Sequence, residues 1–146
     1  MEVFSSEWAE AWREEINADA RYREVGRKWV GGVTLRLFAK DDPKRTRAVF
    51  LDLEGGECLS ACTAGDEEIE RSVVAIRASD DAWRRVLAGE IDPVLGLMGG
   101  TLRLEKGSLL RVLPFADGAR AMLAAATRVG GERPDLGPGG SPQGSR

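Results

Sequence analysis

Apolar residues recur at helical spacing near the start of the chain and then alternate with polar residues. Across Glu7–Tyr22 the pattern places Trp8 and Trp12 on one stripe with charges between them, which predicts an amphipathic helix. Ser5 or Ser6 supplies the hydroxyl N-cap that such a helix prefers. Because apolar stripes at this spacing usually form core, we favour core packing for both tryptophans. Direct contact with a ligand is the alternative.

The middle of the chain predicts β-structure. Four segments show strand-like alternation or β-branched and aromatic runs: Val33–Ala39, Arg45–Glu54, Glu57–Ala64 and Arg71–Ala78. Gly55 and Gly56 favour a two-residue hairpin turn, where positive φ is needed. The charged stretch Gly65–Glu70 is interpreted as another turn. The four strands are therefore expected to form a meander of consecutive antiparallel pairs.

Short elements follow, each marked by a cap or a glycine. Ser79 caps a short helix that Gly89 ends, and Asp92 with Pro93 opens an apolar helix to about Met98. After these come a fifth strand, an apolar segment of undetermined type and an alanine-rich helix: Thr101–Glu105, Ser108–Leu113 and Phe115–Val129. The Gly-, Pro- and Ser-rich residues 130–146 cannot bury themselves, so we expect a folded domain over 1–129 and a disordered tail.

Composition excludes several classes of protein. The 146 residues suffice for one domain, and 42% hydrophobic with 31% charged residues is ordinary for a globular chain. A net charge of −3 gives no basic field for nucleic acid. The basic run at 44–47 is interpreted as a solvated turn, with an anionic-membrane contact as the alternative. No apolar run could span a bilayer and no signal peptide is visible, so we expect a cytoplasmic protein without stable membrane insertion.

The parts of the common catalytic and metal sites are missing from the sequence. With no histidine, Ser-His-Asp and Cys-His nucleophile systems and the usual zinc sites are excluded. Neither phosphate-binding glycine motif occurs. Cys58 and Cys62 would lie roughly 13 Å apart along a strand, too far for a disulfide. Asp52 is interpreted as solvent-facing, although a partly buried catalytic carboxylate is the alternative. We therefore expect neither cofactor nor metal.

The order of elements resembles the sterol carrier protein 2 (sterol-binding, lipid-transfer) family. The resemblance covers about Glu7 to Val129, and the passage Gly100-Thr101-Leu102-Arg103-Leu104-Glu105-Lys106-Gly107 is similar to the family's pattern before its last strand and C-terminal helices. It implies an α+β fold in which a five-stranded, mainly antiparallel sheet carries helices on one face. It also implies an apolar tunnel between the two layers, which accepts fatty acids, acyl-CoA or sterols, and no catalytic residues. The tryptophan pair Trp8 and Trp12 matches no family motif, so sterol itself is not assumed.

Flexible apolar side chains from several short elements could line such a tunnel. The residues that we predict to contact the ligand are Trp8, Trp12, Leu95, Leu97, Met98, Leu102, Leu104, Leu109, Leu110 and Met122. On residue types alone a plain, filled core is the better explanation, and only the family resemblance reverses that preference.

Three hypotheses of function follow. The first is non-catalytic binding and carriage of an apolar lipid ligand. The second is an interaction module or accessory subunit with a filled core, docking on an enzyme of lipid metabolism. The third is an enzyme that uses carboxylates on a lipid-like substrate. The sequence does not indicate an oligomeric state.

Overall fold

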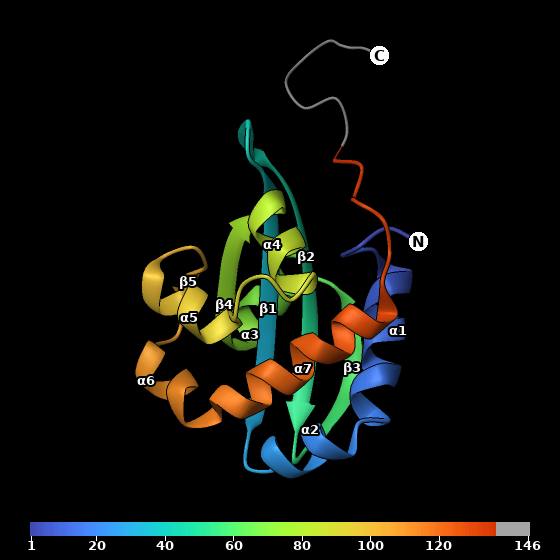
Figure 1. The fold of residues 1–146 in the computed structure, drawn as a ribbon, viewed down its shortest axis with the longest axis vertical. Helices are drawn as coiled ribbons and strands as arrows, with labels where there is room; N and C mark the ends of the chain where they lie inside the picture. The colour runs from blue at the N-terminus through green and yellow to red at the C-terminus, as the bar shows by residue number, and fades with distance from the viewer. Residues whose placement is uncertain (137–146) are drawn as a thin grey trace.

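The computed structural model describes residues 1–136 of the chain, in which helices and one mixed sheet form two main layers (Figure 1). The five strands are β1 Val30–Ala39, β2 Asp42–Glu54, β3 Glu57–Thr63, β4 Ser72–Ser79 and β5 Arg103–Lys106. The helices are α1 Ser6–Asn17, α2 Ala20–Val25, α3 Asp66–Arg71, α4 Asp80–Leu87, α5 Pro93–Gly99, α6 Leu109–Val112, the 3-10 turn η1 Leu113–Phe115 and α7 Ala116–Val129. The predicted α+β class with a five-stranded, mainly antiparallel sheet is confirmed.

The sheet order β3-β2-β1-β4-β5 corrects the predicted meander. The β1–β2, β2–β3 and β4–β5 pairs are antiparallel, but β4 lies parallel to β1 instead of pairing with β3. The connection between β3 and β4 is α3, where the sequence predicted a turn. Glu68 starts this helix, because its carboxylate accepts the backbone N–H of Gly65 at 2.7 Å, as in a capping box. A helical crossover is what a parallel strand pair requires.

The crossover helix α3 packs on the sheet face opposite to the other main helices. Ser72 donates its hydroxyl to the Glu68 carbonyl at 2.9 Å, and the same hydroxyl lies 2.7 Å from the Thr34 hydroxyl. The Arg71 guanidinium sits 4.8 Å from the centre of the Phe50 ring. Helix α3 therefore buries Thr34 and Phe50, which the strand alternation directs to this face.

The first predicted helix is two helices. Helix α1 ends at Asn17, and Asp19 begins α2 by accepting the Tyr22 backbone N–H at 3.0 Å. An aspartate in this position satisfies an N–H that would otherwise lack a partner, so it favours a new start over continuation. After the break, α2 lies against the β2–β3 turn, close to Gly56.

The inner face of the sheet forms the core together with α1, α4 and α7. Val33, Leu35 and Leu37 point to this face from β1, as the period of two predicts, and all three are buried. Trp8 and Trp12 are fully buried on α1, and their rings lie 5.0 Å apart. The core-packing interpretation of the two tryptophans therefore agrees with their burial.

The first residues of the predicted tail lie against the body. Val3 donates its backbone N–H to the Glu132 carbonyl, and Glu132 donates to the Met1 carbonyl, both at 3.0 Å. Leu136 is half-buried against the core. The rest of the predicted disordered tail, residues 137–146, lies outside the described residues.

Alanine substitutions at Gly55 and Gly56 test the close approach of the hairpin to α2. Both have positive φ, of 63° and 88°, but a Cβ on Gly56 would lie 2.5 Å from the Arg23 carbonyl oxygen of α2, whereas one on Gly55 has room. Gly55→Ala should cost about 1 kcal/mol through its backbone conformation. Gly56→Ala should cost about 1–3 kcal/mol more, because the clash adds to it. Urea denaturation measures both, and equal losses would contradict the close approach of the hairpin to α2.

Candidate functional site

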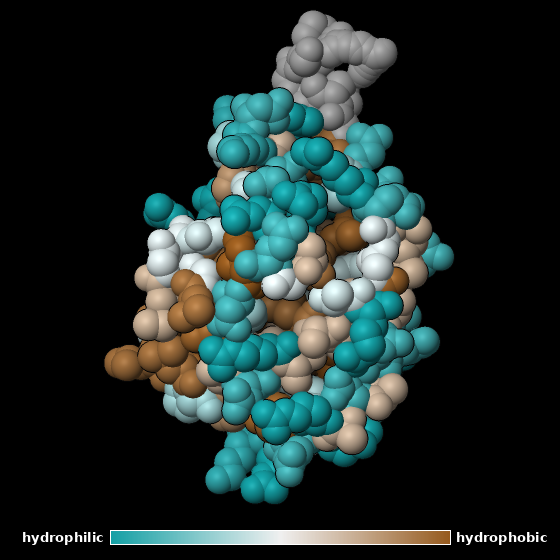
Figure 2. Space-filling view, in the orientation of Figure 1, coloured by the Kyte–Doolittle hydropathy of each residue, from teal (hydrophilic) through white to brown (hydrophobic). Residues whose placement is uncertain are grey.

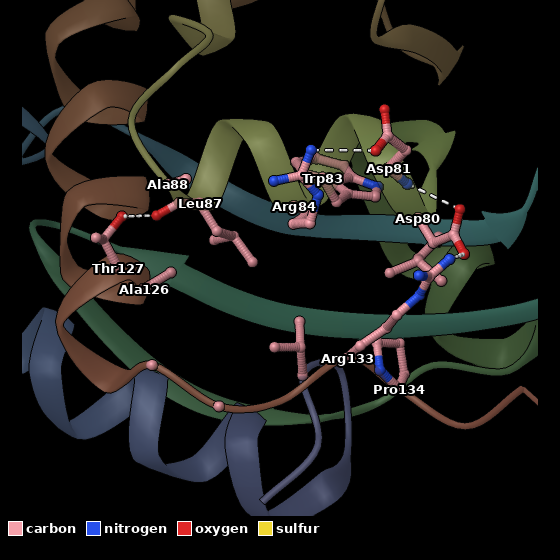
Figure 3. Close-up of a pocket in the computed structure, with 14 residues that line it drawn as sticks. Asp80, Asp81, Trp83, Arg84, Leu87, Ala88, Ala126, Thr127, Arg133 and Pro134 are labelled. Carbon is pink, nitrogen blue, oxygen red and sulfur yellow. Dashed lines mark hydrogen bonds and ion pairs between the residues drawn. The ribbon is translucent and has the colours of Figure 1, made fainter.

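A cavity of about 270 Å³ lies between α4, α7 and the segment that follows α7 (Figure 3). We call residues 130–134 of that segment the strap. Apolar side chains form the cavity's floor, and charged side chains from α4 and the strap form its rim. The lining residues are Val3, Leu37, Asp80, Asp81, Trp83, Arg84, Leu87, Ala88, Ala126, Thr127, Gly130, Gly131, Arg133 and Pro134.

Helix α4 is fixed over the sheet by three contacts. The Ser79 hydroxyl caps it by accepting the Ala82 N–H at 3.0 Å. The Trp83 indole donates to the Arg36 carbonyl of β1 at 2.8 Å, and the Thr127 hydroxyl donates to the Leu87 carbonyl at 2.8 Å. These bonds join α4 to β1 and to α7, so the cavity walls have defined positions.

Two ion pairs lie at the rim of this cavity, and one of them crosses its mouth. Arg133 on the strap lies 3.1 Å from Asp80 of α4, so this pair crosses the mouth. Arg84 lies 3.2 Å from Asp81 within α4 itself. Figure 3 shows both pairs as dashed contacts along the rim. The charges balance, which leaves the apolar floor as the dominant feature of the cavity.

A second, smaller cavity of about 60 Å³ lies at the other end of α7 and is almost entirely apolar. Its wall comprises Tyr22, Gly26, Trp29, Val33, Leu53, Val74, Ile76, Val112, Phe115, Gly118, Ala119 and Met122. Burial raises the pKa of Tyr22 to about 12, so this phenol stays neutral at ordinary pH. The Trp29 and Phe115 rings meet edge to face at 5.0 Å.

The two cavities share one interface between α7 and the inner face of the sheet. Helix α7 contributes Met122 to the smaller and Ala126 to the larger, one helical turn apart. Strand β1 contributes Val33 to the smaller and Leu37 to the larger, roughly 13 Å apart at strand spacing. Leu35 lies between them on the same face and is buried. The cavities are therefore two openings along a single apolar layer.

Both α1 tryptophans hold α7 above that layer. The Trp12 indole donates to the Met122 carbonyl at 2.8 Å, and the Trp8 indole donates to the Gly130 carbonyl at 2.9 Å. Phe4 stacks on Trp8 with ring centres 5.2 Å apart. The tryptophans thus position the cavity wall and belong to the lining of neither cavity.

The structure distributes the ten predicted ligand residues over four environments. Trp8, Trp12 and Leu102 lie in the core, and Met122 lines the smaller cavity. Half-buried positions are taken by Leu97, Leu104 and Leu109. Leu95, Met98 and Leu110 are exposed, with 62%, 60% and 82% of their surface accessible. Ligand contact stays a prediction for these residues, and Met122 alone of the ten lines the larger or the smaller cavity.

Several lining residues were not predicted from the sequence, among them Tyr22, Trp29, Trp83, Phe115 and Ala126. The inward face of β1 was visible in its alternation, and it does supply Val33 and Leu37 to the cavities. No local pattern showed which helices would cover that face, because the covering contacts join residues far apart in sequence.

Both cysteine thiols of residues 1–136 favour their protonated form. Burial raises the pKa of the Cys58 thiol to about 12, and it also raises the pKa of Cys62. Raised values disfavour the thiolate that a nucleophile needs. Asp52 is half-buried on the β2 face opposite to Leu51 and Leu53. No set of three potential metal ligands gathers in this part of the chain.

Comparison with known proteins identifies the architecture. No family model and no curated protein matches the sequence. A crystal structure of sterol carrier protein 2 is 32% identical, with a TM-score of 0.80, over 88% of this chain and 100% of that one. A solution structure of a conserved hypothetical protein from Thermus thermophilus, described as possibly a sterol carrier protein, is also 32% identical. Its TM-score is 0.79 over 94% of this chain and 95% of that one.

A more distant structure shares the fold. Apo sterol carrier protein 2 from Yarrowia lipolytica is 18% identical, with a TM-score of 0.57 over 81% of this chain and 88% of that one.

None of the helices in residues 1–136 has the length and apolar character to cross a membrane.

The variant Arg133→Gln tests whether the Arg133–Asp80 pair holds the strap in place. Arg133→Gln should speed amide hydrogen exchange in residues 130–134 by up to about fivefold, because an exposed ion pair contributes about 0.2–1 kcal/mol. Arg84→Gln is the matched control, since it removes a rim ion pair that does not cross the mouth. Exchange measured by mass spectrometry should change in the first variant alone. Equal exchange in both would show that the pair does not hold the strap.

The Cys58 thiol generates a test at alkaline pH. In the folded state the Cys58 thiol keeps its proton until the pH approaches its pKa, which burial raises to about 12. In the unfolded state the thiol loses its proton at about pH 8.5. The thiol's contribution to the free energy of unfolding is therefore complete below about pH 8.5 and is lost as pH rises toward the folded pKa. Urea denaturation of wild type and Cys58→Ser should differ by an amount that falls with pH, approaching about 1.4 kcal/mol per unit. A constant difference from about pH 8 to about pH 10.5 would contradict burial of the thiol.

Proposed function

The chain belongs to the sterol carrier protein 2 family, and from this premise we propose that it binds and carries one fatty acyl chain between α7 and the sheet. The fold is that of lipid-binding and transfer proteins. The observation that carries the proposal is the pair of cavities along one apolar layer. The proposed ligand runs along β1, past Leu35, from the larger cavity to the smaller one.

Cavity size favours a slender ligand over a rigid one. Ligand pockets commonly measure about 300–1,000 Å³; the larger cavity has about 270 Å³ and the smaller about 60 Å³. A fused sterol ring system has a fixed width, so it requires a wide space to be opened in one step. An acyl chain enters one methylene at a time, and each buried methylene contributes about 0.8 kcal/mol. A free fatty acid or an acyl ester therefore fits the layer better than a sterol.

Helix α7 is the part that yields to the ligand in this proposal. Its buried face consists mainly of small residues, Gly118, Ala121, Ala125 and Ala126, with Met122 and Leu123 among them. Small side chains let the helix lie close to its neighbours, so a modest outward shift opens space without dragging large groups. Met122 is the flexible member of this face and can change rotamer to follow a chain.

The polar groups at the larger cavity suit the ligand's headgroup. Arg84 and Arg133 sit at the rim, each beside an aspartate. A carboxylate that emerged there would exchange one of these aspartates for itself as the arginine's partner. The mechanism then consists of binding and release, with no chemical step and no catalytic residue.

An interaction module is the second candidate, and the small size of the cavities favours it. In that case the apolar layer stays closed and the exposed side chains of α5 and α6 contact a partner protein. The two proposals differ in whether purified protein binds a free lipid.

The test of the function is titration of delipidated protein with a fluorescent fatty acid, followed by displacement with unlabelled fatty acid, acyl-CoA and sterol. We expect saturable micromolar binding, with fatty acid and acyl-CoA competing better than sterol. Folded protein without saturable binding would exclude the carrier function and favour the interaction module. Preferential displacement by sterol would overturn the argument from cavity width.

Variants at the cavity walls locate the bound chain. Leu87→Trp fills the larger cavity and Ala119→Phe the smaller one, so each should weaken fatty acid binding about tenfold or more. Ala124→Phe is the control, because Ala124 lies on the exposed side of α7. Circular dichroism and urea midpoints establish that each variant is folded. Unchanged affinity in both wall variants would place the ligand elsewhere.

A further inference from the structure

Large apolar side chains gather on the surface of α5, α6 and η1. Leu95 and Met98 are exposed on α5, Leu110 on α6 and Leu113 on η1. Figure 2 shows this surface as the brown area at the left of the molecule, over α5 and α6. We call these four residues the α5–α6 patch. The other exposed large apolar residues in the described chain are Met1, Val30 and Leu59.

The backbone holds the patch residues outward. Leu95 and Met98 are three apart on one helix, as are Leu110 and Leu113 along α6 and η1, so each pair shares a face. On α5 the residues on either side of Leu95, Val94 and Gly96, are buried, and a Cβ on Gly96 would lie 3.2 Å from Leu102. Asp92 fixes the start of α5 through its bonds to the Val94 and Leu95 N–H groups. The patch cannot turn inward without unpacking α5.

Positive charge accompanies the patch. The segment 93–113 contains Arg103, Lys106 and Arg111 against one acid, Glu105, which pairs with Arg36 at 2.9 Å. Arg111 reaches the Val30 carbonyl at 3.3 Å, so the exposed apolar Val30 and the adjacent basic pair 27–28 lie beside α6. This local excess is opposite in sign to the chain's net charge of −3.

From this combination we propose that the α5–α6 patch docks on the surface of an anionic lipid bilayer. Leucine and methionine side chains enter the headgroup boundary, while Arg111 beside Leu110 and the other basic residues of the segment attract anionic lipids. A second copy of the chain fits less well. Its twofold contact would bring like charges together, and stable interfaces use about 20–30 residues a side, far more than the patch offers. The exposed face of α1 is acidic, with Glu7, Glu10 and Glu14, so it does not compete for such a surface.

Helix α6 and η1 also form a wall of the smaller cavity. The role of docking in ligand transfer rests on the proposed carrier function. Leu110 and Leu113 point outward, while Val112 between them and Phe115 after them line that cavity. Helix α6 has only four residues, and its Arg111 contacts the Trp29 ring at 5.2 Å. A short element with few contacts opens at low cost. Docking therefore places an easily opened cavity wall at the bilayer, where an acyl chain can pass.

Vesicle sedimentation with the full chain tests the docking. Wild type should bind vesicles of phosphatidylglycerol and phosphatidylcholine more tightly than vesicles of phosphatidylcholine alone. Leu110→Ser and Met98→Ser should each weaken binding to the anionic vesicles by about tenfold. Leu59→Ser is the matched control, because Leu59 is an equally apolar, exposed residue on β3, outside the patch. Arg103→Gln should reduce binding to anionic vesicles and leave binding to neutral vesicles unchanged.

The outcomes separate this proposal from the carrier function. Absence of wild-type binding to anionic vesicles, or equal losses in Leu59→Ser and the two patch variants, would overturn the docking surface. A patch variant that changes the oligomeric state in vesicle-free buffer while keeping vesicle affinity would also overturn it, in favour of self-association. Fatty acid titration of wild type without vesicles tests the carrier function separately. Its failure in wild type would refute the carrier function independently of the vesicle result.

Discussion

Two indole hydrogen bonds join α1 to α7 and to the residue that follows it, and the layering of this protein depends on them. Trp12 donates to Met122 and Trp8 to Gly130, across sequence separations of 110 and 122 residues. Both rings are fully buried, so losing either bond would leave a buried donor without a partner at a cost of about 1–3 kcal/mol. This constraint sets the height of α7 above the sheet, and hence the size of the two cavities beneath it.

The site follows from that arrangement. Small residues on α7 face the apolar layer, and the two cavities lie where α4 and the strap, or α2 and η1, border the helix. A layer that is apolar throughout and has charged groups only at one rim suits a molecule with one long apolar part and one polar end. Family membership and local geometry therefore both support the proposal that the chain binds a lipid.

The opposite ends of the layer differ in character. The larger cavity is bounded by ion pairs and by a strap that is bonded to the N-terminal residues. The smaller cavity is bounded by α6 and η1, which carry exposed leucines on their outer side. Leu95, Met98 and Leu110 were predicted as ligand contacts because they are flexible and apolar. In the structure the same properties suit them to a surface that meets lipid from outside.

Short-range features were determined by the sequence alone. The Gly55–Gly56 hairpin, the helix starts at Ser79 and Asp92, and the alternation of β1 depend on neighbours a few residues away, so local physics decides them. The placement of β4 beside β1, the helix α3 in place of a turn, and the exposure of Leu110 were decided by tertiary structure. So was the choice of α7 and α4 as cavity walls. Each of these depends on contacts between segments far apart in the sequence. The free energies of such contacts cannot be estimated from a local sequence pattern.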